Sequence, residues 1–427
     1  MATAAPKKRA PGPPAAVAAH AATTGTPRPS AAALKAARAG QTGGGGKPLR
    51  FYINAVLFLW AMTACSLAIN WVQLVALPLS LVSRRHYRRW MRFTQRLFGS
   101  LMLTVTYVFA PLEIVMTGDH EGLTGDSVAV IMANHQIYTD WWYIWLFAWF
   151  RNAHGEIKIM LKDSLAKLPI FGWGMQFFEF IFMARKWGKD KQTLTSNLAR
   201  ARDDKMPLWL LIFPEGTVIT DDTKAKSRAY AKKADLPDDP THVLIPKSTG
   251  LLNSLRVMGS DVEYLYDFTI GYSGIGPDAC PYDAYPLTSV FFEGKGPAQI
   301  HIHVDRFKVA DLPGVRRAAD DGDIVTPGAA RAKAQARSNG SSSSSSNSGS
   351  NGADADTNPE FALWLRQRFL EKDEMLKAFY ERGRFPELSR DGTGITQALT
   401  ISPHVQDWIT LAGLLVGSVL SSLYLLF

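Results

Sequence analysis

Residues Ser127–Trp142 read SVAVIMANHQIYTDWW, and this stretch decides the fold. Its first part, SVAVIMA, is almost wholly apolar and rich in β-branched residues, which is typical of a short strand buried on both faces. The polar residues Asn134, His135 and Asp140 follow directly. In α/β proteins, sites lie at the carboxyl ends of parallel strands. The stretch therefore predicts a strand that ends at a site.

Further short apolar runs lie on the carboxyl side of this strand, with helical stretches between them. They are Ile157–Leu161, Leu208–Phe213, Val243–Pro246, Glu263–Ile270 and Gln299–Val304. Strands that alternate with helices indicate an α/β fold with a largely parallel sheet. We therefore expect a central, largely parallel sheet flanked by helices, with membrane helices at the two ends of the chain.

The spacing of His135 and Asp140 restricts how the two side chains can meet. Residues in a helix advance about 100° each, so on one helix the two side chains would point about 140° apart. They can meet if His135 lies on the turn and Asp140 begins the next helix, where the helix dipole favours a carboxylate. Asp140 would then bind one imidazole nitrogen and leave the other as a general base. The alternative is a purely structural hydrogen-bonded pair.

Three other polar groups also follow apolar runs. An arginine ends the run FEFIFMAR, Glu-Gly-Thr follows the run LWLLIFP, and Pro-Lys follows the run VLI. An arginine offers a planar fork suited to phosphate. The residues concerned are Arg185, Glu215, Gly216, Thr217, Pro246 and Lys247. Each group alone also matches an ordinary surface arginine or strand-to-loop turn.

Taken in order, these groups resemble the glycerophospholipid acyltransferase family, which includes the 1-acylglycerol-3-phosphate O-acyltransferases. The resemblance is good over residues 127–250. Arg185-Lys186-Trp187 and Glu371-Lys372-Asp373 are similar to the eukaryotic subgroup that acts on lysophosphatidylinositol or lysocardiolipin.

The resemblance implies a role for each matching position. His135 would deprotonate the acceptor hydroxyl, and Asp140 would orient His135. The substrate would be bound or lined by Asn134, Arg185, Glu215, Gly216, Thr217, Pro246 and Lys247. Two positions depart from many relatives, because Ile137 stands in place of serine and Val218 in place of arginine. Loss of that arginine makes lysophosphatidic acid a less secure acceptor and favours a larger headgroup.

The chemistry agrees with this reading. An alcohol is too weak an acid to ionise at neutral pH, whereas an imidazole with a pKa of about 6.5 can act as a base. A thioester is already activated, so we expect acyl-CoA as co-substrate, no bound cofactor and no covalent intermediate. No Gly-x-Ser-x-Gly nucleophile motif is present. The expected activity is acyl transfer to a lysophospholipid. The alternatives are a CoA-independent transacylase and a non-catalytic lipid-binding scaffold.

Composition excludes other classes of protein. The two cysteines, Cys65 and Cys280, have no metal-ligand spacing, and a disulfide between them is not expected. His301 and His303 alternate with apolar residues and are expected to be exposed strand positions, not a metal pair. The net charge of +9 fits nucleic acid, anionic lipid or a polyphosphate ligand equally well, so the charge alone does not choose among them. Nucleic acid is not expected as a partner, because the basic residues border apolar runs without a recognition pattern.

The chain ends carry the membrane signals. Residues 51–83 contain no charged residue. This run is longer than the ~20 residues that a helix needs to cross a bilayer. Six arginines follow between residues 84 and 96 and suggest the cytosolic side and anionic headgroups, or else a solvated basic helix. The run 97–112 is short for a span, and 408–427 is a further uncharged run. The family and the absence of a cleavable signal favour the endoplasmic reticulum membrane.

The predicted organisation has six parts. They are a disordered basic tail (1–48), membrane-associated helices (49–118), an acyltransferase catalytic domain (119–310), a low-complexity linker (311–358), an amphipathic helical region (359–400) and a C-terminal membrane helix (406–427). For the amphipathic region, packing against the body is the first expectation and docking on a membrane the second.

Overall fold

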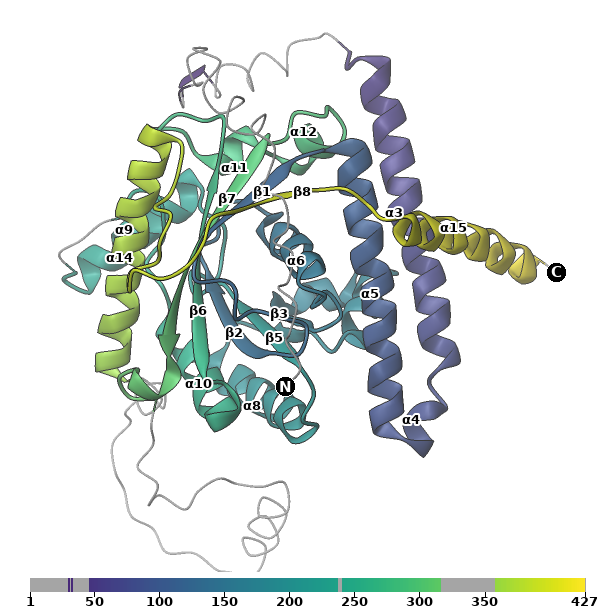
Figure 1. The fold of residues 1–427 in the computed structure, drawn as a ribbon, viewed down its shortest axis with the longest axis horizontal. Coiled ribbons are helices and arrows are strands. Elements are labelled where there is room, and N and C mark those ends of the chain that lie inside the picture. Colours follow the sequence, from purple (N-terminus) through teal and green to yellow (C-terminus); the bar gives the residue numbers. More distant parts are fainter. Residues whose placement is uncertain (1–29, 31, 34–45, 237–239, 316–357, 427) are drawn as a thin grey trace, which may run out of the picture.

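The computed structural model describes residues 30, 32–33, 46–236, 240–315 and 358–426, and side chains as far as residue 419. Nearly all of the predicted tail and most of the predicted linker lie outside these residues. The centre is an eight-stranded sheet in the order β4-β3-β5-β2-β6-β7-β1-β8 (Figure 1). The strands are β1 (Glu113–Gly118), β2 (Val128–Ala133), β3 (Ile157–Lys162), β4 (Ile181–Met183), β5 (Leu208–Ile212), β6 (Tyr264–Tyr272), β7 (Gln299–Lys308) and β8 (Gln397–Thr400).

The sheet is mostly parallel, as predicted. Strands β4, β3, β5, β2 and β6 all run in one direction, and only the β6–β7 and β1–β8 pairs are antiparallel. Strand β2 lies between β5 and β6. Because neighbouring parallel strands end at the same edge, the residues after β2, β5 and β6 meet there.

Two features of the sheet differ from the prediction. Residues Val243–Pro246 form no strand, because the Leu244 N–H donates to a Glu215 carboxylate oxygen (2.9 Å) instead of to a neighbouring strand. Strands β1 and β8 belong to the same sheet although they lie in the regions predicted to be membrane-associated and amphipathic helices. The boundary predicted at residue 118 is therefore not a structural break.

Helices cover both faces of the sheet. They are α3 (Leu49–Val75), α4 (Leu79–Val82), α5 (Arg84–Phe109), α6 (Asp140–Phe150), α7 (Phe171–Phe177), α8 (Trp187–Asp203), α9 (Asp221–Lys233), α10 (Ser248–Met258), α11 (Pro281–Ala284), α12 (Leu287–Phe291), α14 (Pro359–Arg382) and α15 (Val405–Leu426), with short 3-10 turns at Asp163–Lys167, Gly259–Asp261 and Val309–Asp311. In Figure 1, α14 and α9 lie on one side of the sheet and α3 and α5 on the other.

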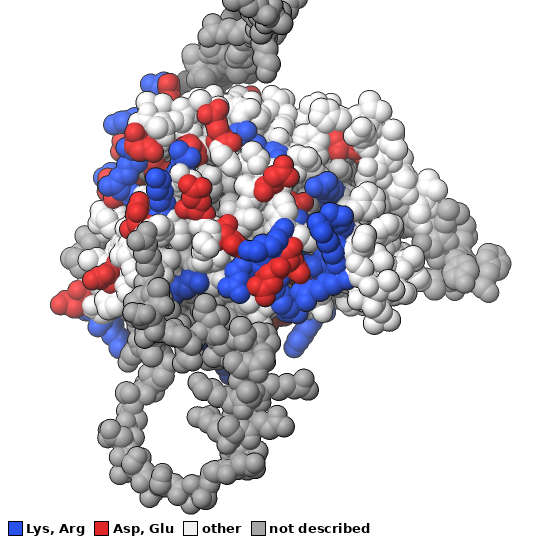
Figure 2. All heavy atoms as spheres, turned by 60° about the horizontal axis from the view of Figure 1, so that its bottom comes forward, with Lys and Arg blue, Asp and Glu red and all other residues white. Residues whose placement is uncertain are grey.

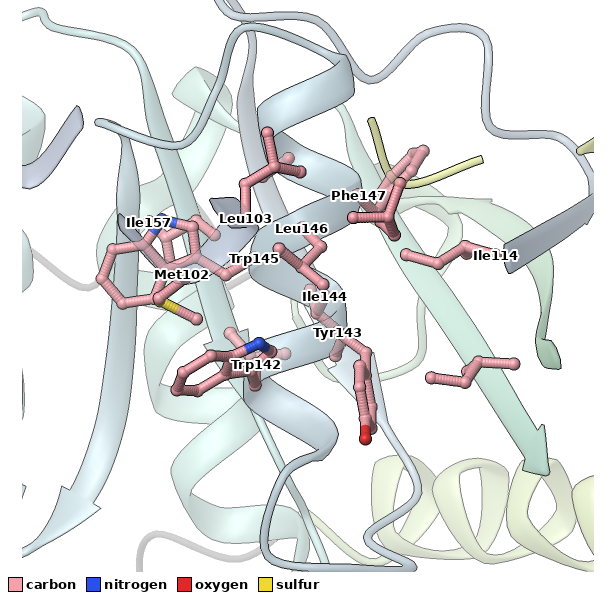
Figure 3. Packing of buried hydrophobic residues seen from close by; sticks show 14 of the residues in the cluster. Met102, Leu103, Ile114, Trp142, Tyr143, Ile144, Trp145, Leu146, Phe147 and Ile157 are labelled. Atoms are coloured by element: carbon pink, nitrogen blue, oxygen red, sulfur yellow. The ribbon is translucent and has the colours of Figure 1, made fainter. Parts of the chain in front are cut away.

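Helix α6 is the core of one layer. Its aromatic residues Trp142, Tyr143, Trp145 and Phe147 are all at most 5% exposed. Figure 3 shows them packed between the sheet and Met102 and other residues of α5. The aromatic run of α6 is therefore part of the protein core.

Helix α5 combines the arginine cluster and the following apolar run. Leu101, Met102 and Leu103 are fully buried, so this run lies on the protein core and not in a membrane interface. Four of the six arginines contact acids of the body. The ion pairs are Arg84–Asp204, Arg88–Glu179, Arg88–Asp204, Arg92–Glu156 and Arg96–Glu156. Much of the basic cluster thus fastens α5 to the sheet layer.

One helical stretch among the described residues, Leu49–Val82, is long and apolar enough to cross a membrane. Nearly half of its most apolar window is buried inside the protein, so length and composition alone are weak evidence for a span. The apolar part of α15 within the described side chains is shorter. Two terminal membrane helices are therefore not confirmed. Figure 2 shows that the part of the molecule formed by α3, α4 and α15 carries few charged side chains.

Helix α14 packs against the body, as its amphipathic pattern predicted. Phe361, Leu365, Phe369, Leu376 and Phe379 are at most 1% exposed. The helix begins with an Asn358 side-chain cap and ends at Gly383 in the left-handed conformation (φ 83°). This is the usual way to start and stop a helix.

Candidate active site

Asp140 is the first residue of α6, and its carboxylate accepts hydrogen bonds from both sides. Oδ2 accepts from His135 Nδ1 (2.7 Å), from Gln136 N (2.6 Å) and from Ile137 N (3.0 Å). Oδ1 accepts from the Tyr272 hydroxyl. Asp140 is fully buried. His135 on the turn and Asp140 at the helix start are the arrangement that the spacing predicted.

This contact determines which imidazole nitrogen is available. When Nδ1 carries the proton and donates to Asp140, Nε2 keeps its lone pair. No described residue hydrogen-bonds to Nε2, and the His135 side chain is 17% exposed. The imidazole can therefore accept a proton at Nε2 while Asp140 stabilises the positive charge.

Tyr272 was missed by sequence reasoning. It ends β6, and its hydroxyl reaches Asp140 from the neighbouring strand. Burial and the adjacent Asp140 carboxylate raise the Tyr272 pKa well above its ordinary value, so the hydroxyl stays protonated and donates. The one signal for Tyr272 in the sequence is its polar hydroxyl at the end of a strand, β6, that lies beside β2.

The backbone of His135 is held by the loop after β5. Its N–H donates to Glu215 Oε1 (2.7 Å), and its carbonyl accepts from Ile219 N (3.0 Å). The imidazole ring stacks on Phe213 with 4.2 Å between ring centroids. These contacts fix the position of the ring, whose side chain remains 17% exposed.

Glu215 and Asn134, two of the residues predicted to bind substrate, are hydrogen-bonded to the protein itself. Both side chains are buried. Glu215 accepts from His135 N and from Leu244 N, and Asn134 bonds both the N–H (2.8 Å) and the carbonyl (3.0 Å) of Ile270. The prediction that these two side chains bind substrate is therefore not supported. They hold the edge of the sheet together.

Burial also affects the ionisation of Glu215. Desolvation raises its pKa to about 8, although the two backbone donors oppose the shift.

Two cations and a glycine meet beside this loop. Arg185 Nη2 donates to the Gly216 carbonyl (2.9 Å), and a β-carbon placed on Gly216 would lie 3.6 Å from Lys247 Nζ. Both cations are exposed, and Lys247 makes no ion pair with a described residue. Gly216 has a φ of 72° and Arg185 a φ of 62°, the left-handed region that glycine adopts readily and arginine rarely. The predicted residues Arg185, Gly216 and Lys247 thus come together, with Thr217 half-buried in the same loop.

The segment that carries Pro246 and Lys247 lies against the same loop. The Lys247 N–H donates to the Pro214 carbonyl (2.8 Å), which keeps Pro246 and Lys247 next to Gly216. Pro246 is half-buried. Arginine and lysine both bind phosphate in known sites. The two exposed cations therefore offer a place where a phosphate could bind.

No group of three or more His, Cys, Asp or Glu side chains in the described part of the chain could hold a metal ion. His301 and His303 are 6% and 2% exposed, so the expectation of exposed positions is wrong. His301 packs on Phe379, and His303 Nδ1 bonds the Thr117 hydroxyl (2.8 Å), because α14 covers this face of the sheet.

Comparison with protein families gives two matches. The acyltransferase model matches residues 115–272, which contain every predicted site residue. The model named acyltransferase C-terminus matches residues 355–408, which include α14 and β8.

Comparison with individual proteins gives relatives that match most of their length. An uncharacterized acyltransferase of Schizosaccharomyces pombe is 30% identical over 79% of this chain and 88% of its own. The 2-acyl-1-lysophosphatidylinositol acyltransferase of Saccharomyces cerevisiae is 31% identical over 72% and 80%. The lysocardiolipin acyltransferase 1 of Gallus gallus is 30% identical over 72% and 68%. No solved structure matches the chain.

Proposed function

This chain belongs to the acyltransferase family, and we propose that it transfers a fatty acyl group from acyl-CoA to the free hydroxyl of a lysophospholipid. The observation that carries the proposal is the His135–Asp140 pair at the edge of the sheet, with Nε2 of His135 left available. An imidazole held in this way is the group that acyl transfer to an alcohol requires.

The proposed reaction proceeds by direct attack. Nε2 of His135 takes the proton of the acceptor hydroxyl while the hydroxyl oxygen forms a bond to the thioester carbonyl carbon. The carbon–sulfur bond then breaks, and the proton on the imidazole passes to the leaving CoA thiolate. Asp140 stabilises the imidazolium in between. Each proton and electron pair is accounted for without a covalent acyl-enzyme.

The proposed acceptor carries a phosphate. Arg185 and Lys247 would bind it beside Gly216, at the loop that holds His135. Lys247 would supply the second positive charge in the absence of an arginine at Val218. The relatives named for lysophosphatidylinositol, lysocardiolipin and 1-acyl-sn-glycerol-3-phosphate suggest these three acceptor types as candidates. A bound cofactor is not part of this scheme.

The proposed location is a membrane, with the endoplasmic reticulum as the first choice. The support is the exposed apolar surface of α3, where Tyr52, Ile53, Val56, Leu57 and Trp60 are all about half exposed or more. Such a contiguous apolar surface suits lipid better than water.

The proposal is tested with the full-length chain in detergent, labelled oleoyl-CoA and one lysolipid at a time. We expect released CoA and a labelled lipid with one acyl chain more than the acceptor, in equal amounts. His135→Ala should lower kcat by about a hundredfold or more, whereas His86→Ala, which changes an exposed histidine of α5, should not. Product formed without acyl-CoA from another phospholipid would favour the transacylase. Lipid binding without any product would favour the scaffold.

A further inference from the structure

The segment Thr241–Lys247 has no regular secondary structure, yet its residues 242–244 are buried and it is bonded to the site. Its Leu244 N–H binds Glu215, and its His242 carbonyl accepts from Gln136 Nε2 (2.7 Å). Gln136 is the residue after His135. Lys247 ends the segment beside Gly216. Displacing this segment would therefore move both Lys247 and the groups that hold His135.

The other side of the segment is bound by α14. Asp373 accepts from the backbone N–H of Thr241 (3.1 Å) and of His242 (2.5 Å), one with each carboxylate oxygen. Asp373 is 8% exposed. The His242 ring also packs on Tyr380, one further α14 residue, at 5.4 Å. A charged acceptor for two backbone donors replaces the strand partner that this segment lacks.

Helix α14 is itself anchored independently of Asp373. The preceding residue, Lys372, is 1% exposed and forms an ion pair with Asp267 of β6. Its Nζ also donates to the Phe268 carbonyl (2.7 Å). Strand β6 supports the site as well, since Tyr272 at its end binds Asp140. Adjacent residues of α14 thus bind strand β6 and the segment Thr241–Lys247, both of which reach the site.

We propose that Asp373 is a positioning residue for the acyl transfer. It keeps Thr241–Lys247 in place, so that the Lys247 amine faces Gly216 and Arg185 where the acceptor phosphate binds. This inference rests on the proposed function and adds that α14, in the region matching the acyltransferase C-terminus model, works as part of the acceptor site.

The test compares Asp373→Asn with Glu381→Gln, which removes one charge from an exposed position of the same helix. Asparagine replaces one carboxylate oxygen by an NH2 group, which donates, so one of the two backbone N–H groups loses its acceptor. With oleoyl-CoA and lysophosphatidylinositol, we expect Asp373→Asn to raise the KM for the lysolipid about tenfold and to change the KM for oleoyl-CoA less than about twofold. Glu381→Gln should match the wild type.

A second arm separates positioning from general destabilisation. If Asp373 acts through Lys247, Asp373→Asn should add less than about a twofold effect in a Lys247→Ala background, because coupled residues are not additive. A lowered kcat at unchanged lysolipid KM, or effects that multiply in the double variant, would overturn the inference. If Asp373→Asn does not fold, Asp373→Glu replaces it, because glutamate keeps the charge but displaces the carboxylate oxygens. We then expect the KM for the lysolipid to rise about threefold.

The wild type separates this inference from the proposed function. A wild-type chain that transfers no acyl group to any lysolipid defeats the proposed function. A wild type that transfers, with Asp373→Asn behaving like Glu381→Gln, defeats only the role of Asp373.

Discussion

Asp140 and Glu215 are both buried carboxylates at the site, but they differ in the number and kind of hydrogen-bond donors around them. Asp140 accepts hydrogen bonds from two backbone N–H groups, the Tyr272 hydroxyl and the His135 ring. Glu215 has two backbone donors only, and its pKa is raised to about 8. Burial of a carboxylate with only two donors therefore favours the protonated form of Glu215.

A consequence at the residue scale is a pH-dependent stability. The folded protein holds a proton on Glu215 more tightly than the unfolded chain, so this stabilisation is complete below about pH 4.5 and is lost as the pH rises towards about 8. Glu215→Gln removes the titrating group. From pH 5.5 to pH 8, the thermal midpoint should therefore fall more in the wild type than in Glu215→Gln. Glu374→Gln, at an exposed position of α14, should keep the wild-type slope. Equal slopes in the wild type and Glu215→Gln would mean that Glu215 is ionised throughout.

Among the elements, α5 has the most specific attachment to the body. Its basic face meets acids of the sheet layer, and its apolar face covers α6. Arg88 is only 5% exposed and lies between Glu179 and Asp204. The neighbouring Arg89 is exposed. Partial burial makes such a contact matter more than a pair on the surface.

We therefore expect Arg88→Ala to destabilise the protein by about 3 kcal/mol, because Glu179 and Asp204 lose a partner that is removed from water. Arg89→Ala should change the free energy of unfolding by less than about 0.5 kcal/mol. Thermal unfolding in detergent measures both. An Arg88→Ala midpoint equal to that of Arg89→Ala would contradict the attachment of α5 through this residue.

At the scale of the whole molecule, the charged and uncharged surfaces are separated. Charged side chains gather over the sheet layers, and few lie on the part formed by α3, α4 and α15 (Figure 2). Strands β1 and β8 pair with each other, although six other strands and α14 lie between them in sequence. The part formed by α3, α4 and α15 is therefore attached, through β1 and β8, to the same sheet as the site.

A pair of matched substitutions tests the role of this surface. Val56 on α3 and Leu363 on α14 are 65% and 67% exposed. Val56→Lys should weaken retention in lipid vesicles, because a lysine within the apolar layer costs about 2.5–3.5 kcal/mol at its centre. Leu363→Lys should have no effect. Sedimentation of reconstituted vesicles at high salt measures the retained fraction, and equal retention of the two variants would count against α3 as a lipid-facing helix.

The sequence by itself determined the features that depend on neighbours along the chain. The strand β2, the turn at His135 and the helix start at Asp140 follow from apolar pattern, spacing and helix dipole, which act over a few residues. Only the tertiary structure decided that Glu215 and Asn134 hold the sheet edge, and that Tyr272 and Asp373 reach the site. These contacts join residues separated by 80 positions or more along the chain. A long-range hydrogen bond leaves no pattern in the local sequence. A buried polar side chain needs a partner, but the residues next to it in sequence do not specify which distant group that partner is.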